Sequence, residues 1–172
     1  MKLDVLASNP AQSQSWYADG LRFTCSQCGN CCTGGPGYVW ISDDEIVRLA
    51  EFLKLTAEET IDKYCRKIHG RFSLRETRRD GLYDCIFLKE VPAESSSNGD
   101  QVVHTRRVCS VYPVRPLQCR TWPFWAENLD SEQDWQRAGR KCPGIGQGRK
   151  FTLKQIHAIR DAADWPERPP TS

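Results

Sequence analysis

The chain is 172 residues long, with 39% hydrophobic and 27% charged residues and a formal net charge of +2. This length suits a single domain with its own core, and the lack of any run of roughly 18 apolar residues excludes a membrane-spanning helix. The small net charge gives little support to a nucleic-acid partner.

The two ends of the chain differ from its middle in composition. Residues 1–20 are polar, and we expect a loosely ordered arm held on the body by Trp16 and Tyr17. Residues 21–165 carry the periodic and cysteine-rich segments and are the expected domain, and the proline-rich residues 166–172 are the expected tail. The first residues lack a long apolar core, so we expect no secretory signal peptide.

A run of four cysteines follows the arm, at Cys25, Cys28, Cys31 and Cys32. A Cys-x-x-Cys turn brings two sulfurs within reach of one ion, while backbone N–H groups point at those sulfurs. Gly29 suits such a turn because glycine adopts positive φ without strain. Three thiolates at this spacing, with a fourth ligand from elsewhere, would complete a tetrahedral zinc site or a cubane iron–sulfur cluster.

The chain has nine cysteines in all, and disulfides are the first alternative to a bound metal. The odd number, the missing signal peptide and the strained ring that adjacent Cys31 and Cys32 would form all argue against disulfides. A reducing cytoplasm, where we expect the protein to reside, keeps thiols free. The sequence therefore favours a metal framework, with inert buried thiols as the remaining alternative.

Regular elements follow the cysteine run. Aromatic and β-branched residues predict a short strand over 38–41. Two capping boxes, each a serine or threonine three positions before a glutamate, predict helices that begin at Ser42 and Thr56. The second helix is expected to reach His69, with Cys65 on its apolar face as a buried helical cysteine outside the metal framework.

Strands are predicted next along the chain. Residues 72–78 and 82–89 have the pattern of a hairpin that turns at the Asp-Gly pair between them. A surface loop rich in proline, serine and asparagine is expected over 91–100. Residues 101–108 then alternate enough to predict a further strand, which delivers Cys109 at its end.

The last part of the chain combines an aromatic segment with two helices. Residues 109–125 are rich in proline and aromatic residues, and we expect an irregular segment wrapped around the metal. Residues 131–140 are predicted to be helical, and the glycines within 144–148 follow no convincing strand and indicate a loop. A capping box at Thr152 opens the last predicted helix. The prediction is a small single α+β domain with short antiparallel strands, three to four helices and irregular cysteine-bearing loops around a metal centre.

Three further motifs contain the other cysteines of interest, and they read Cys85-x-Phe-Leu, Cys109-x-x-Tyr-x-x-Arg-Pro-x-x-Cys119-Arg-x-Trp-Pro and Cys142-Pro-Gly. Together with the initial run, they resemble the CxxCxxCC cysteine-cluster family of zinc- or iron-chelating domains, also called YkgJ-like proteins, over residues 23–148. The resemblance implies bound zinc or iron, with a 4Fe–4S cluster as the expected form, and it brings no defined reaction. It implies metal ligands at the eight matching cysteines: Cys25, Cys28, Cys31, Cys32, Cys85, Cys109, Cys119 and Cys142.

Eight thiolates suffice for two four-sulfur sites, which would change the formal net charge from +2 to about −2. Side chains of adjacent residues usually diverge, so the two neighbouring cysteines are not expected to serve one ion in equivalent ways. We expect Cys31 to join Cys25 and Cys28, and Cys32 to face a second site or to bridge the two. Spacing alone leaves the connectivity open.

Two arginines flank one of these cysteines. Arg115 and Arg120 lie on either side of Cys119 and are candidates to donate to cluster sulfurs or to an anionic substrate, with an ordinary ion pair as the alternative. Tyr112 is expected to pack in the core. Trp122 and its aromatic neighbours suit base stacking on single-stranded nucleic acid, but apolar shielding of a metal site is the simpler interpretation.

Three classes of function stay open: a redox or cofactor-handling protein with an iron–sulfur cluster, a zinc-stabilised module that binds another protein, and a metal carrier. Thiolates bind zinc, iron–sulfur clusters and Cu(I) alike. The tight cysteine spacing over 25–31 and the aromatic segment 109–125 favour iron, whereas zinc is the commoner occupant of cysteine sites. No catalytic constellation independent of metal stands out, so whether the protein is an enzyme also stays open.

Overall fold

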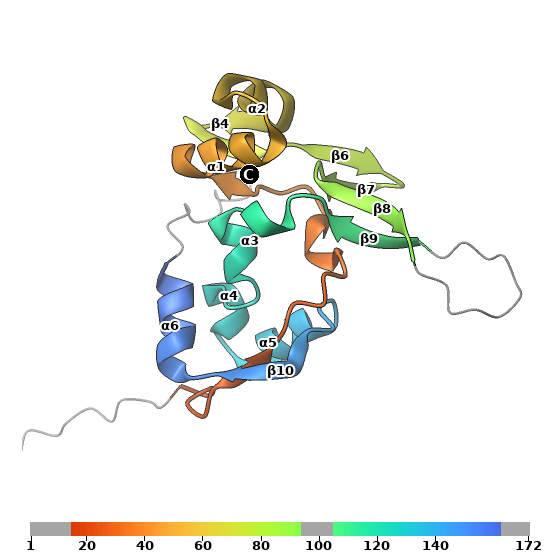
Figure 1. Ribbon diagram of the computed structural model, residues 1–172. Helices are drawn as coiled ribbons and strands as arrows, with labels where there is room; N and C mark the ends of the chain where they lie inside the picture. The colour runs from red at the N-terminus through yellow and green to blue at the C-terminus, as the bar shows by residue number, and fades with distance from the viewer. Residues whose placement is uncertain (1–14, 94–104, 163–172) are drawn as a thin grey trace, which may run out of the picture.

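The chain contains helices and short antiparallel strands, grouped in runs, in the computed structural model, which describes residues 15–93 and 105–162 (Figure 1). This is the α+β class that the sequence predicts. The helices are α1 (Asp43–Leu53), α2 (Ala57–Tyr64), α3 (Leu117–Thr121), α4 (Ala126–Leu129), α5 (Glu132–Gly139) and α6 (Leu153–Asp161), with 3₁₀ helices η1 (Asn30–Cys32) and η2 (Tyr112–Val114). The strands are β1 (Leu21–Phe23), β2 (Thr33–Gly34), β3 (Trp40–Ile41), β4 (Cys65–Ile68), β5 (Arg71–Leu74), β6 (Glu76–Arg79), β7 (Leu82–Cys85), β8 (Leu88–Pro92), β9 (Thr105–Cys109) and β10 (Ile145–Phe151).

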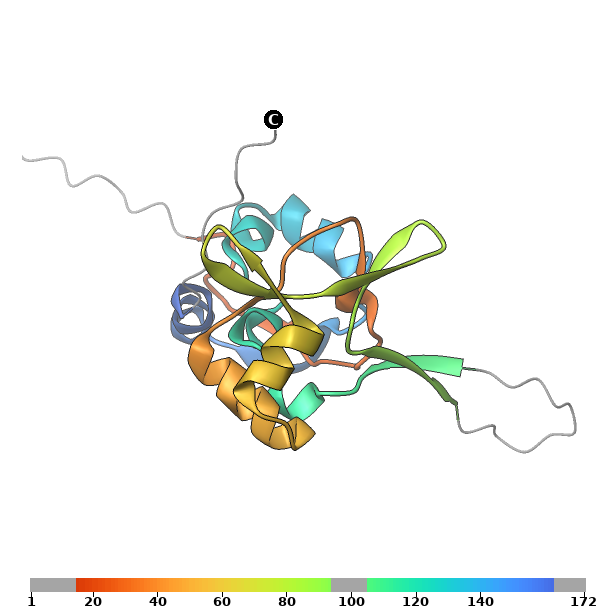
Figure 2. The same ribbon diagram turned by 90° about the horizontal axis from the view of Figure 1, so that it is seen from above.

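Within the described residues, the strands form four small antiparallel sheets, ordered β1–β10, β2–β7–β6, β3–β5–β4 and β8–β9. Figure 2 shows the β6–β7 and β8–β9 hairpins extending from the same side of the molecule. The β1–β10 pair joins the two ends of the described chain, with Leu21 opposite Phe151. Sheets this small bury little surface of their own, so helices and connecting segments contribute to the core together with the strands.

Two hydrophobic cores result, on opposite sides of α3 (Figure 1). In the upper core, α1 and α2 pack against the β3–β5–β4 sheet. In the lower core, aromatic side chains from α5 and β10 meet α6. The upper core consists of Ile41, Ile46, Leu49, Cys65, Leu74, Phe87 and Val111. The lower core consists of Tyr17, Phe124, Leu129, Trp135, Phe151 and Ile156.

The predicted capping boxes are confirmed. Ser42, Thr56 and Thr152 each accept a hydrogen bond from the backbone N–H three residues on, and the glutamate or glutamine there accepts one from the cap's own N–H. These reciprocal bonds satisfy donors that a helix start otherwise leaves unpaired. Of the expected arm, only residues 15–20 are described; there Tyr17 is buried, and Nε1 of Trp16 donates to the Leu129 carbonyl at 2.8 Å.

The prediction that Cys65 lies on a helix is wrong. Helix α2 ends at Tyr64, and Cys65 begins β4, opposite Leu74 of β5. The reason is the turn that follows: His69 and Gly70 both have positive φ, 46° and 83°, which is the conformation of a two-residue hairpin turn. The hairpin pairing therefore prevails over the helical pattern. Cys65 is buried in the upper core, as expected.

The predicted hairpin over 72–89 is only partly right. Strands β6 and β7 do pair and turn at Asp80 and Gly81, but the chain leaves this sheet on both sides. Before it, β5 joins β3 and β4; after it, β8 pairs with β9. The two predicted strands are thus divided among three sheets, so residues 72–89 contribute to three different sheets of the molecule.

Two predictions for the later chain are also corrected. The glycine-rich segment predicted as a loop is β10, where Gly146 and Gly148 have positive φ and the pairing with β1 is irregular. The segment 109–125 is not irregular throughout, because η2 and α3 lie within it. The strand predicted over 101–108 is described from Thr105 only. Residues 1–14, most of the 91–100 loop and the 166–172 tail lie outside the described residues.

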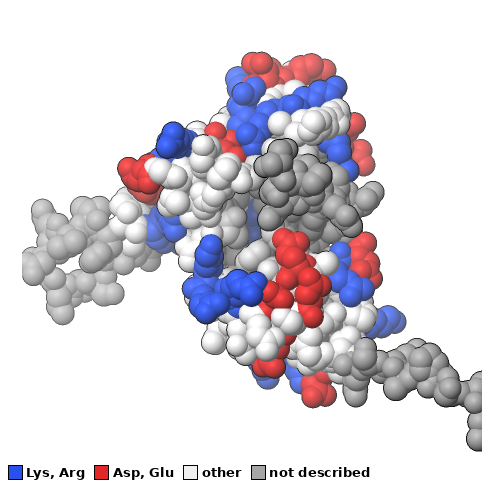
Figure 3. Space-filling view, turned by 180° about the vertical axis from the view of Figure 1, so that it is seen from behind, with Lys and Arg blue, Asp and Glu red and all other residues white. Residues whose placement is uncertain are grey.

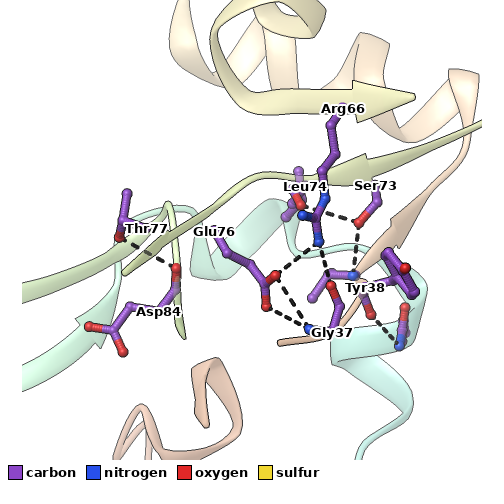
Figure 4. A network of polar contacts seen from close by, with 10 residues as sticks. Gly37, Tyr38, Arg66, Ser73, Leu74, Glu76, Thr77 and Asp84 are labelled. Carbon is purple, nitrogen blue, oxygen red and sulfur yellow. Dashed lines mark hydrogen bonds and ion pairs between the residues drawn. The ribbon is translucent and has the colours of Figure 1, made fainter. Parts of the chain in front are cut away.

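A polar network holds the chain that leaves the cysteine run (Figure 4). Arg66 forms an ion pair with Glu76 at 2.9 Å and donates to the Gly37 carbonyl, while the Gly37 N–H donates to Glu76 at 3.2 Å. The Ser73 hydroxyl accepts the Val39 N–H at 3.1 Å. These bonds hold residues 37–39, a short distance after the cysteine run, against two sheets.

Candidate metal centre

A cavity of about 80 Å³ lies where the two cores face each other, and seven cysteines line it. Phe23, which packs on the lower core, is on its wall, and so is Cys109, which packs on the upper core. We call this space the cysteine cavity. Its cysteines are Cys25, Cys28, Cys31, Cys32, Cys109, Cys119 and Cys142.

The cysteine run bends into the cavity at Gly29. This glycine has φ 74° and immediately precedes η1, which carries Cys31 and Cys32. A Cβ atom there would lie 2.9 Å from Leu88 and 3.0 Å from Cβ of Arg107, so the residue is also required by close packing on the β8–β9 hairpin. The predicted use of Gly29 in a tight turn is confirmed. The Sγ atoms of Cys31 and Cys32 are 3.8 Å apart.

Strand pairing brings Cys85 next to the run, although Cys85 is not on the cavity wall. In the β2–β7 ladder Thr33 lies opposite Asp84, so the preceding Cys32 falls beside the following Cys85. The Thr33 hydroxyl donates to the buried Asp84 carboxylate and secures this register. A carboxylate that accepts a hydrogen bond inside the protein therefore positions one of the eight cysteines.

Cys109 arrives from the neighbouring hairpin. It ends β9 opposite Leu88, and the N–H of Ser110 donates to the Phe87 carbonyl at 2.9 Å. Phe87 is two residues after Cys85 and Ser110 directly follows Cys109, so this bond holds the two cysteines close together in space. Cys119 reaches the cavity from the middle of the short helix α3.

Asn30 links three of the cysteine segments. Its Nδ2 donates to the Lys141 carbonyl at 2.9 Å, and its Oδ1 accepts from Nη2 of Arg107 at 2.8 Å. Lys141 precedes Cys142, and Arg107 stands two residues before Cys109. The amide of one side chain, within the cysteine run, thus holds both of the other segments in place.

Close backbone packing completes the cavity on the Cys142 side. The Thr24 N–H donates to the Gly144 carbonyl at 3.1 Å, and a Cβ on Gly144 would lie 2.0 Å from the Thr24 carbonyl oxygen. Only glycine permits this approach. It sets Cys25, the residue after Thr24, near Cys142.

The electrostatics of the thiols favour a cation. The hydrogen bond from Cys32 lowers the pKa of Cys31 to about 7, and the same hydrogen bond raises the pKa of Cys32. Burial raises the pKa of Cys85 to about 11 and, together with nearby cysteines, holds the pKa of Cys119 well above its usual range. Several thiols in one place therefore resist ionisation, and a bound cation would stabilise their thiolate forms.

The donor set fits a soft metal. Thiolates are the ligands of zinc and of iron–sulfur clusters, and these thiols surround one cavity. Among the described residues, however, no group of three or more histidine, cysteine, aspartate or glutamate side chains is close enough together to hold one ion as it stands. The eight-cysteine ligand set accordingly remains a prediction.

The two arginines differ in their surroundings. Arg115 lies on the cavity wall, with Nη1 4.0 Å from Sγ of Cys25 and its guanidinium over the Tyr112 ring. Arg120 instead forms an ion pair with the buried Glu45 at 3.4 Å and donates to the Arg115 carbonyl at 3.0 Å. Arg115 therefore lies at the thiols, whereas Arg120 forms an ordinary ion pair, which was the alternative to a role at the metal centre.

Sequence reasoning missed Asn30 and Asp84 as site-forming residues. Each stands directly beside a cysteine of the motif, which was the only available signal. Their partners are far away in sequence, 111 residues in the case of Asn30 and Lys141, so spacing did not show them.

The comparisons with known proteins agree with this geometry. Residues 24–143, more than two thirds of the chain, match the CxxCxxCC family, described as a "Putative zinc- or iron-chelating domain". The chain belongs to the CxxCxxCC family. The matched range includes all the cysteines of the cavity. Zinc and iron, the metals in the family's description, are metals that thiolates bind.

A relative of this CxxCxxCC protein comes from Methanocaldococcus jannaschii. Its name is "Uncharacterized protein MJ0661", and it is 27% identical over 108 residues, which are 63% of this chain and 48% of the relative. The chain thus matches about half the length of that protein. No solved structure matches the chain. Among the described residues, no helix has the length and apolar character that crossing a membrane requires.

Proposed function

We propose that this CxxCxxCC domain holds an iron–sulfur cluster, of the 4Fe–4S type, and serves a redox or cofactor-handling role. The convergence of seven cysteines on one cavity carries the proposal. The cavity volume of about 80 Å³ supports a polynuclear centre, because a single water-sized group needs only about 10–15 Å³ on the same measure. When bound, such a cluster would supply one-electron chemistry.

The chain's own residues would have distinct tasks. The eight motif cysteines are the proposed ligands, four of them for the cluster and four for a second four-sulfur site. Cys85 would join the set from beside Cys32. Arg115 is the proposed donor to the thiolate of Cys25, since a guanidinium stabilises negative charge on sulfur. Arg120 would act through Arg115, by holding its backbone carbonyl. Phe23 and Trp122, both on the wall, limit the access of water.

A metal carrier is the second candidate, and the exposure of Cys25 and Cys31 favours it. Thiolates at the surface exchange their ion with another ligand more readily than enclosed ones. A zinc-stabilised module that binds another protein is the third. Under any of the three, the nine free thiols suit a reducing compartment, and we propose the cytoplasm.

Nucleic acid is left out of this proposal. On the face shown in Figure 3, basic and acidic side chains of the described residues lie in neighbouring groups. Such a mixed face lacks the continuous basic surface that supports binding to a phosphate backbone.

Anaerobic purification tests the proposal, with iron, zinc and acid-labile sulfide measured per chain and a visible spectrum recorded. A brown protein with iron and sulfide supports the cluster. A colourless protein with stoichiometric zinc contradicts the cluster and supports the zinc-stabilised module. Zinc that passes readily to an acceptor protein or chelator supports the carrier.

The ligand set is tested by Cys25→Ser, Cys28→Ser and Cys119→Ser, with Cys65→Ser as the matched control. A serine hydroxyl is a harder and far less acidic ligand than a thiol, so the three motif variants should lose metal. Cys65 lies in the upper core, away from the cavity wall, and its variant should keep the full metal content. Equal loss from Cys65→Ser would refute the assignment, and retention by all three motif variants would refute chelation by the motif.

A further inference from the structure

The indole of Trp122 holds a buried donor that lacks an acceptor. Its Nε1 is one of two buried side-chain nitrogen or oxygen atoms in the described residues without a hydrogen-bond partner, and Trp122 lies on the wall of the cysteine cavity. Two other indoles are satisfied: Trp16 donates to Leu129 at 2.8 Å, and Trp125 donates to the Gln118 carbonyl at 3.1 Å. A buried donor is rarely left unpaired, so an acceptor at this position is to be expected.

The ring is held in its position by its surroundings. Trp125 packs edge-on against it, with ring centroids 4.9 Å apart and planes at 84°. Trp122 also follows directly on α3, the helix that carries Cys119. The indole is therefore held on the cavity wall, with its Nε1 buried and unable to turn easily out to water.

Sulfur is the most frequent side-chain acceptor on the cavity wall, since seven of the wall residues are cysteines. The side-chain oxygens on the wall, from Ser26, Gln27, Asn30 and Tyr112, do not accept from Nε1 in this structure. A neutral thiol accepts hydrogen bonds weakly, whereas a thiolate bound to a metal carries negative charge and accepts them well. The missing partner therefore belongs to the metal-bound state of the site.

We propose that the Nε1–H of Trp122 donates a hydrogen bond to a cysteine thiolate of the metal centre. The inference rests on the proposed function, because it requires bound metal. The bond positions the thiolate and withdraws part of its charge, as the partners that surround metal ligands do in other sites. Trp122 is thus a positioning residue of the centre. Trp16, whose N–H donates to the Leu129 carbonyl and which is not on the cavity wall, is its matched control.

The test uses reduced protein with ¹⁵N-labelled indoles and Zn(II) as the probe. The chain has six tryptophans, and Trp122→Phe and Trp16→Phe assign two of the indole N–H signals. On zinc loading, the Trp122 signal should shift and its exchange with solvent should slow, while the Trp16 signal stays unchanged. The Trp122→Phe variant should hold Zn(II) about tenfold more weakly in competition with a chelator, and Trp16→Phe should match the wild type.

Zinc content, measured by elemental analysis, separates the possible failures. An unmoved Trp122 signal at full zinc occupancy overturns this inference and leaves metal binding standing. If the wild type takes up neither zinc nor iron, the proposed function fails and this inference fails with it. Where Trp122→Phe does not fold, Phe variants of the other five tryptophans assign their wild-type signals, and the Trp122 signal is identified by elimination.

Discussion

The upper core and the cysteine cavity both enclose cysteine thiols, but the side chains around the thiols differ between the two regions. In the upper core, Cys65 packs among aliphatic side chains, and burial raises its pKa to about 11. On the cavity wall, burial is again the main cause of the raised pKa of Cys119, but neighbouring thiols add to the increase. The difference teaches that burial alone does not mark a ligand. The neighbours of a thiol decide whether it merely fills space or can join others around an ion.

Truncation in the upper core should have the largest effect on stability. Leu49 is fully buried, so Leu49→Ala should lower the free energy of unfolding by about 2–5 kcal/mol, through lost burial and the space left behind. Urea unfolding measures this loss. The metal content of the folded fraction should match that of the wild type. A Leu49→Ala protein that folds but holds no metal would show that the two regions are not separate.

Metal removal should act on the other region. At an ion concentration a hundred times the dissociation constant, binding contributes about 2.7 kcal/mol to stability, and chelation removes that contribution. Amide exchange followed by mass spectrometry should show faster exchange at residues 24–33 and 139–145. Helix α1, in the upper core, serves as the internal control. Unchanged exchange and an unchanged melting temperature after chelation would argue against a structural metal.

Loss of the Asn30 amide should cost less. Asn30→Ala removes the bonds to Lys141 and Arg107, and we expect a loss of about 1–2 kcal/mol together with weaker metal retention. The control is Asn128→Ala, which removes a comparable bond to the Pro123 carbonyl at 2.9 Å. Unfolding curves and chelator competition compare the two. If both variants retain metal equally well, Asn30 does not organise the cavity.

The smallest effect is expected for Cys65→Ala. Its sulfur fills space in the upper core, so its loss should cost about 1 kcal/mol and leave metal content unchanged. Thermal unfolding and metal analysis of the purified variant check both values. A marked fall in bound metal would place Cys65 among the ligands and remove the distinction between the two regions.

Local signals in the sequence were sufficient for three of the helix starts. The capping boxes at Ser42, Thr56 and Thr152 predict three helix starts correctly, because each box is complete within four residues. The end of α2 was not predictable in the same way. It depends on whether Cys65 continues the helix or pairs with Leu74, and that choice is made by the turn at His69 and Gly70.

For the candidate site, the sequence indicated the kind of donors but not their arrangement. The motif identified the cysteines, and the structure brings seven of them to one cavity. The contacts that achieve this join distant residues, such as Asn30 with Lys141 and Thr33 with Asp84. Pairing over such separations depends on the whole fold, so no local pattern predicts it. The division of the cysteines between metal sites stays a prediction.

The pairing of β1 with β10 has a consequence for the newly made chain. Leu21 and Phe151 are neighbours in the sheet but lie at opposite ends of the described sequence. During synthesis the first four cysteines therefore leave the ribosome long before Cys142, at about 5–20 residues per second. For that interval these thiols lack the wall that Cys142 and Gly144 provide. The order of synthesis thus leaves the early cysteines open to whichever ion or oxidant reaches them first, and ribosome-bound chains are the form most in need of protection.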